Sequence, residues 1–200
     1  FSAIPEDRLH LFAEVGCTHV EELGPAWSDY IYSIDAFATL AGNAMKKKRN
    51  HVNRFMADNP EYSFAELDPA RCMRLLDAVG HDGSPMGAAE WTAVARLLRQ
   101  WDEFAPYMTG RMLLTADGRV AAFTVAEIKG DTLHVHVEKA DHNIPGSGET
   151  VAHLLCREML ETDPGLIYVN RQDNAGDDGL RRAKESWRPS RLLPKYNVTY

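Results

Sequence analysis

Hydrophobic and polar residues alternate along residues 110–140, which is the period of a β-strand. The segments GRMLLTA and VAAFTVAEI flank Asp117-Gly118, a dipeptide that favours the tight turn of a hairpin. Gly130-Asp131 then leads into TLHVHVEKA, where every second residue is apolar. The pattern predicts three consecutive antiparallel strands.

Helical signals precede these strands. Residues 68–80 and 84–105 each open with a capping residue followed by proline, and the first of them ends at a glycine. The second places Trp91 and Trp101 on one apolar face, which indicates core residues rather than a stacking surface for a ligand. Further helices are expected over residues 34–41 and 44–58, and a short strand over residues 62–67.

The pattern after residue 140 alternates between the two element types. A helix is predicted over residues 150–161, a buried strand over 166–170, a helix over 177–187 and a final strand over 195–200. The fold class is therefore α/β with a mixed sheet, in which an antiparallel meander is followed by strand–helix–strand–helix–strand. That is the order of elements in the GNAT acyltransferase fold, and the order alone assigns no function.

The N-terminal segment differs from the rest in charge and patterning. Residues 1–45 carry seven acidic side chains and one basic one. We expect residues 1–28 to be an N-terminal segment that could end a preceding domain, and residues 29–200 to form the acyltransferase-like domain.

Composition narrows the class of protein. The hydrophobic fraction is 44% and the charged fraction 26%, which is ordinary for a globular chain. No apolar run approaches the roughly 18 residues of a membrane span, and no signal peptide is recognisable. The three widely spaced cysteines predict reduced thiols, with Cys72 and Cys156 in the core, so we expect a cytoplasmic protein.

Charge is concentrated in two basic regions on an acidic chain of net charge −7. Residues 46–54 hold five Lys or Arg and no acid, and residues 170–200 hold seven against four acids. On helical spacing Lys47, Asn50, His51 and Arg54 share one face, which suits phosphate or carboxylate groups. The alternative is an ordinary solvated helix face.

A glycine-containing loop lies between the third strand and the following helix. Its residues are Asn143, Ile144, Pro145, Gly146, Ser147 and Gly148. GNAT enzymes hold the coenzyme A pyrophosphate at this position, because glycines let the backbone approach and free amides at a helix start face the anion. The two glycines match that loop, whereas Asn143 replaces its usual Gln or Arg. The alternative is a plain turn.

Carboxylates and imidazoles share the meander. Glu138 alternates with His134 and His136, so the three can lie on one face, and Glu127 is on the preceding strand. A carboxylate there can act as general base towards an amine if burial raises its pKa. The alternative is a polar outer face of the sheet. No third metal ligand accompanies the two histidines, so we expect no metal.

A polar segment follows the strand predicted over residues 166–170. Asn170, Arg171, Gln172 and Asp173 stand at its end, and functional groups often lie at the carboxyl ends of strands in α/β folds. The alternative is a turn with helix capping by Asp177.

Three longer stretches together resemble the phosphatidylglycerol lysyltransferase C-terminal family, a group that includes many domains of unknown function. They are DYIYSIDAFATLAGNAMKKKRNHVNRF, VHVEKAD and IYVNRQDNAGDDGLRRAKESWRPSRLLPKY, and the matches run from Asp29 to Tyr196. The resemblance implies a GNAT-type fold, often as two domains in tandem. In the lysyltransferases the donor is an aminoacyl-tRNA and the acceptor is a membrane lipid.

We therefore expect an acyl or aminoacyl transferase whose donor is a coenzyme A thioester or an aminoacyl-tRNA, with no metal. Glu138 or Glu127 would be the catalytic base. The expected substrate-binding residues, in part carried over from the resemblance, are Lys47, Arg49, Asn53, Arg54, Lys139, Asn143, Gly146, Gly148, Asn170, Arg171 and Lys184. Two other hypotheses are a non-catalytic module that binds RNA or an anionic ligand, and a structural half of a tandem protein.

Overall fold

The computed structural model describes all residues 1–200. The chain divides into two compact units, one formed by Phe1–Ser33 with Tyr168–Tyr200 and the other by Ile34–Ile167. Residues 1–28 contribute strands to the first unit; whether they also end a preceding domain stays a prediction. None of the helices combines the length and apolar character that crossing a bilayer requires.

An antiparallel sheet forms the centre of the Ile34–Ile167 unit. Its neighbouring strands are, in order, β4 (Ser63–Glu66), β5 (Thr109–Leu114), β6 (Val120–Lys129) and β7 (Thr132–Ala140). The predicted meander is confirmed, with β7 at the expected bounds. At the hairpin, the Thr115 amide donates to the Arg119 carbonyl at 3.0 Å and Gly118 takes a φ of 79°, a value that favours glycine.

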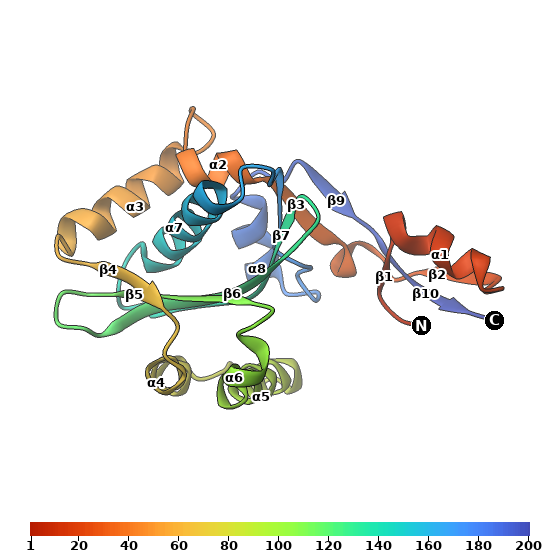
Figure 1. The fold of residues 1–200 in the computed structure, drawn as a ribbon, viewed down its shortest axis with the longest axis horizontal. Coiled ribbons are helices and arrows are strands. Elements are labelled where there is room, and N and C mark those ends of the chain that lie inside the picture. The colour runs from red at the N-terminus through yellow and green to blue at the C-terminus, as the bar shows by residue number, and fades with distance from the viewer. The chain divides into compact units, whose positions relative to one another are not determined.

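Helices cover both faces of this sheet (Figure 1). On one face lie α3 (Lys46–Asp58) and α7 (Ser147–Thr162); on the other lie α4 (Pro69–Val79), α5 (Pro85–Arg99) and α6 (Trp101–Phe104). A further helix, α2, spans Ile34–Thr39. The predicted caps are confirmed, since the Asp68 carboxylate accepts from the Arg71 amide at 3.0 Å and Ser84 Oγ accepts from the Gly87 amide at 2.9 Å. The expected single helix to residue 105 is interrupted at Gln100, which separates α5 from α6.

Strand alternation sends successive side chains to two cores. Met112 and Phe123 pack in the cluster beneath α4 and α5, whereas Leu113 and Ala122 pack in the cluster with residues of α3 and α7. Each large apolar side chain buried in this way contributes about 1.5–3 kcal/mol. The three cysteines are free and buried, and the tryptophans of α5 and α6 pack against the first cluster, as predicted.

The strands of the other unit pair in two antiparallel sets of three. One has the order β1 (Ile4–Pro5), β10 (Lys195–Thr199), β2 (His19–Glu22), and the other β8 (Tyr168–Asn170), β3 (Asp29–Ser33), β9 (Arg191–Leu193). Its helices are α1 (Leu9–Glu14) and α8 (Asp178–Glu185), the latter capped by Asp177 as expected. The sequence reading missed β3, because four consecutive buried residues give no alternation.

Candidate functional site

A charged cluster joins α3 to the first turn of α7. Lys48 is buried, and its Nζ lies 3.2 Å from Glu149 Oε1. Nδ1 of His51 lies 3.0 Å from the same oxygen. Burial raises the pKa of Glu149, but the hydrogen bond from His51 and the charge of Lys48 outweigh it and hold the pKa below its ordinary value. An ionised carboxylate therefore already occupies the start of α7, where the helix dipole favours negative charge.

The glycine-containing loop has two different glycines. Gly146 caps α7 with a φ of 82°, and a Cβ built on it would lie 2.3 Å from the His51 carbonyl oxygen. A Cβ on Gly148 would lie 3.6 Å from Ala140 Cβ, an ordinary contact. The Asn143 side chain donates to Asp141 Oδ1 at 3.0 Å within the loop. Gly146 thus permits the close approach of α3, and a role of these residues in phosphate binding stays a prediction.

The outer face of α3 keeps several polar side chains exposed. Lys47, Asn53 and Arg54 are exposed, and Arg54 Nε lies 3.5 Å from Asp58. Arg49 instead donates to the backbone carbonyls of Leu40 and Gly42. The structure therefore separates the basic segment into an exposed part and a part that anchors the preceding loop.

Glu127 lies near the end of β6 and is bound by a neighbouring histidine and lysine. Its Oε1 lies 2.9 Å from His136 Nε2 and 3.1 Å from Lys129 Nζ. Burial raises the pKa of Glu127, but the hydrogen bonds from Lys129 and His136 outweigh it, so that the pKa is lowered. This is the reverse of the raised pKa that the sequence reading required of a base at this position.

Glu138 belongs to a row of polar residues that crosses the sheet on the α7 side. In register across β4 to β7, the row consists of Glu66, Arg111, Thr124 and Glu138. Glu138 is half-buried, whereas Thr124 is fully buried and its hydroxyl has no hydrogen-bond partner. The next residue, Lys139, points to the opposite face, where its Nζ lies 2.8 Å from Glu90 of α5. Glu138 and Lys139 therefore cannot serve one site on the same face of the sheet.

A second charged network lies inside the other unit. The buried Asn170 amide donates to Asp29 Oδ2 at 2.9 Å. Nζ of Lys195 lies 2.7 Å from Asp29 Oδ1 and 2.5 Å from Asp173 Oδ2. Asn170, expected to bind substrate, therefore joins β8 to β3, and the single cation of β10 bridges the two carboxylates.

A lysine of α8 binds the backbone of the loop that follows β8. Nζ of the buried Lys184 donates to the carbonyl oxygen of Arg171 and lies over the Tyr30 ring, 5.9 Å from its centroid. The Arg171 guanidinium lies over the Trp187 ring at 5.7 Å. Lys184 thus fixes the backbone of this loop, and substrate binding by Lys184 or Arg171 stays a prediction.

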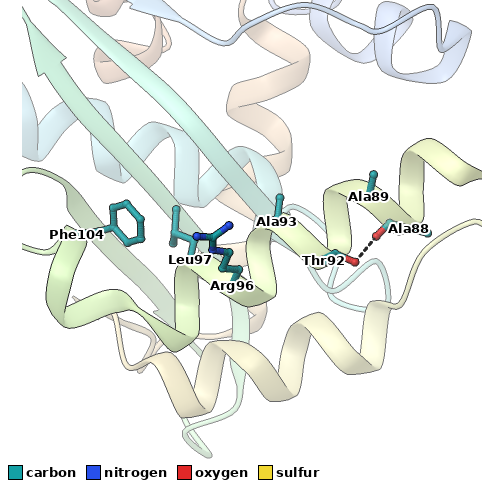
Figure 2. A pocket seen from close by; sticks show the side chains of 7 residues that line it. All are labelled: Ala88, Ala89, Thr92, Ala93, Arg96, Leu97 and Phe104. Carbon is teal, nitrogen blue, oxygen red and sulfur yellow. Dashed lines mark hydrogen bonds between the residues drawn. The ribbon is translucent and has the colours of Figure 1, made fainter.

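A groove of about 680 Å³ lies along α5. Figure 2 shows its lining of small residues between Ala88 and Ala93, with Arg96, Leu97 and Phe104 further along. Thr92 Oγ1 donates to the Ala88 carbonyl and Arg96 Nε to Gln100, so the polar groups are used within the helix. The groove offers no chemistry for a reaction.

Sequence reasoning missed the Lys48–Glu149 and Asp29–Lys195 pairs. A signal existed for the first, because Lys48 precedes the buried Val52 and Phe55 by four and seven residues and so lies on the apolar face of α3. For the second there was none, since residues 29 and 195 come together only through the pairing of strands.

Comparison with known proteins assigns the chain to a family. A family model described as phosphatidylglycerol lysyltransferase, C-terminal, matches residues 1–199. The chain belongs to this family. The resemblance inferred from the sequence motifs is thereby confirmed. The match to the phosphatidylglycerol lysyltransferase C-terminal family includes residues of both compact units of this chain.

Individual relatives agree with this assignment. A conserved protein of unknown function from Bacteroides thetaiotaomicron is 30% identical, with a TM-score of 0.82 over 98% of this chain and 68% of that one. L-PGS from Bacillus licheniformis is 18% identical, with a TM-score of 0.66 over 99% of this chain and 66% of that one. An uncharacterised protein of Mycoplasmoides gallisepticum is 22% identical over 191 residues, 90% of this chain and 58% of the relative.

The fold class is also confirmed by a more distant structure. A tandem GNAT protein from the clavulanic acid biosynthesis pathway has a TM-score of 0.51 at 11% identity, over 96% of this chain and 57% of that one. The likeness at this identity concerns the fold alone. The chain spans between just over half and two-thirds of the length of these relatives.

Proposed function

We propose that this domain transfers an acyl or aminoacyl group from an activated donor to an amine or hydroxyl acceptor. The observation that carries the proposal is the family match over residues 1–199, because the family is described by a lysyl transfer. The donor would be an aminoacyl-tRNA or a coenzyme A thioester, and the reaction would take place in the cytoplasm. The lysyl transfer in the family's description fits the first kind of donor, and the tandem GNAT protein, whose structure is described as being without AcCoA, fits the second.

Glu138 is the residue that we assign as general base. It is half-buried on β7, and the other carboxylate expected for this role, Glu127, is held by Lys129 and His136. The acceptor nitrogen or oxygen would attack the carbonyl carbon of the donor while Glu138 accepts its proton. The bond from that carbon to the tRNA oxygen or the thioester sulfur would then break, and the proton would pass to the leaving group. A base in this role contributes about 10²–10⁴-fold to the rate.

The exposed face of α3 would contact phosphate groups of the donor. Lys47, Asn53 and Arg54 present two cations and an amide to solvent, and Arg54 is engaged only by the equally exposed Asp58. The start of α7 suits an anion less well, because the carboxylate of Glu149 already lies there. This favours a donor with many phosphates along an open surface over one whose pyrophosphate requires the loop at Gly146.

The test uses the full-length protein with two donors. Lysyl-tRNA is supplied with phosphatidylglycerol vesicles and the transfer of labelled lysine is counted; acetyl-coenzyme A is supplied with free amines and the release of thiol is followed. Glu138→Gln should lower the rate by about 10²-fold or more with an unchanged unfolding transition. Glu103→Gln, at an exposed position of α6, is the matched control.

Two outcomes would contradict the proposal. A full rate in Glu138→Gln would remove Glu138 from the reaction. Absence of turnover with both donors, together with RNA binding that weakens with salt, would favour the non-catalytic RNA-binding module.

A further inference from the structure

A second cleft, of about 360 Å³, lies between the edge strand β4 and α7. Its volume is at the lower end of the roughly 300–1,000 Å³ of small-molecule sites. Three elements contribute side chains, and the lining residues are Tyr62, Phe64, Glu66, Arg111, Leu154, Arg157, Glu158 and Glu161.

The cleft has an apolar end and a charged end. Phe64 lies opposite Leu113 in the sheet and packs with Tyr62 against the core cluster that contains Leu154. Two residues further along β4, Glu66 lies opposite Arg111. A ligand along the cleft would therefore meet aromatic rings with its stem and charged groups with its head.

The charged end of the cleft favours a cationic ligand. Three carboxylates face two guanidinium groups, and one of those, Arg111, is bound by Glu158 through Nε and Nη2. Its Nε lies 2.9 and 3.0 Å from the two carboxylate oxygens and its Nη2 2.6 Å from Oε1. The hydrogen bonds that Arg111 donates to Glu158 raise the pKa of Arg111.

Among the other charged groups of the cleft, one carboxylate makes no hydrogen bond or close ion pair. Arg157 Nε lies 3.9 Å from Glu161, and both side chains are largely exposed. Glu66 is exposed and makes no hydrogen bond within the chain, although its charge acts on the guanidinium of Arg111 across the strand pair. Its carboxylate oxygens can therefore still accept hydrogen bonds from a ligand. Aromatic faces such as those of Phe64 and Tyr62 attract cations as well.

A buried hydroxyl next to the charged end also indicates an absent polar partner. Thr124 lies across from Arg111 on the same face of the sheet, is fully buried, and its Oγ1 has no hydrogen-bond partner. A buried polar group in this state calls for a water or a ligand atom. Thr124 does not itself line the cleft, so this unsatisfied hydroxyl belongs to the polar row beside the charged end and not to the site of the head group.

We propose that this cleft binds a primary alkylammonium ion, with the ammonium at Glu66 and the alkyl stem along Phe64 and Tyr62. The site is separate from Glu138, because three strand spacings of about 4.8 Å place the two carboxylates roughly 14 Å apart along the polar row. Binding here does not depend on the transfer reaction.

The test is calorimetric titration of the protein with n-pentylamine at pH 7, where the amine is protonated, with 1-pentanol and pentanoate as neutral and anionic counterparts. We expect saturable binding of the amine only. Glu66→Gln keeps the shape of the side chain and lies at an exposed position. It should weaken binding of the amine by about ten-fold, which is ~1.4 kcal/mol. The control Glu103→Gln should leave the affinity for the amine unchanged.

Three results would overturn the site. They are an unchanged affinity in Glu66→Gln, pentanoate binding as tightly as the amine, and no saturable binding of the amine. None of them bears on the transfer reaction, which is measured separately with its own donors.

Discussion

Replacing Gly146 by alanine perturbs the point at which α3 and α7 approach each other. The residue has a φ of 82°, and the new Cβ would lie 2.3 Å from the His51 carbonyl oxygen and 3.2 Å from Phe55 Cβ. The left-handed conformation costs a residue with a Cβ about 1–2 kcal/mol. The clash with backbone adds about 1–3 kcal/mol as the helices separate. Gly146→Ala should therefore lose about 2–5 kcal/mol of unfolding free energy.

Gly148→Ala is the matched control two residues along. Its Cβ would make an ordinary contact with Ala140, and the backbone there is helical. Since glycine inside a helix costs about 0.5–1 kcal/mol relative to alanine, this variant should be as stable as the parent protein or slightly more so.

Urea unfolding followed by circular dichroism measures both variants. Neutral surface changes typically alter the unfolding free energy by up to about 0.5 kcal/mol. A Gly146→Ala protein whose unfolding free energy lies that close to the parent's would refute the packing argument. The same would hold if Gly148→Ala were equally damaging. Loss of donor binding in Gly148→Ala without loss of stability would instead support a phosphate-binding role for this loop.

Two further effects concern the charged networks. The folded-state pKa of Glu149 lies below its ordinary value. Its stabilising contribution should therefore be present above the unfolded-state pKa and be lost as the pH falls through the lower folded value. Melting temperatures from pH 3 to 7 should show a smaller loss of stability in acid for Glu149→Gln than for the parent protein. Lys195→Met should cost about 3–5 kcal/mol, because it leaves the carboxylate of Asp29 buried and unpaired; urea unfolding of Lys195→Met and of the double variant Lys195→Met/Asp29→Asn measures this, and an equal loss in both would contradict it.

Periodicity and capping residues in the sequence were sufficient for much of the secondary structure. The hairpin at Asp117-Gly118, the strand over residues 132–140 and the helix starts at Asp68 and Ser84 follow from short-range chemistry, since a turn or a cap is decided within a few residues. The family motifs were sufficient for the GNAT-like class, and they located Glu138 on a strand of the meander.

Only the tertiary structure decided which charged residues are partners. Lys48 rather than Lys47 pairs with Glu149, because the apolar spacing of Val52 and Phe55 turns that face of α3 towards α7. The lowered pKa of Glu127 and the pairing of Asp29 with Lys195 depend on groups brought together by strand pairing. Local sequence carries the period of an element, whereas the burial and the neighbours that set a group's charge and pKa come from segments far apart in the chain.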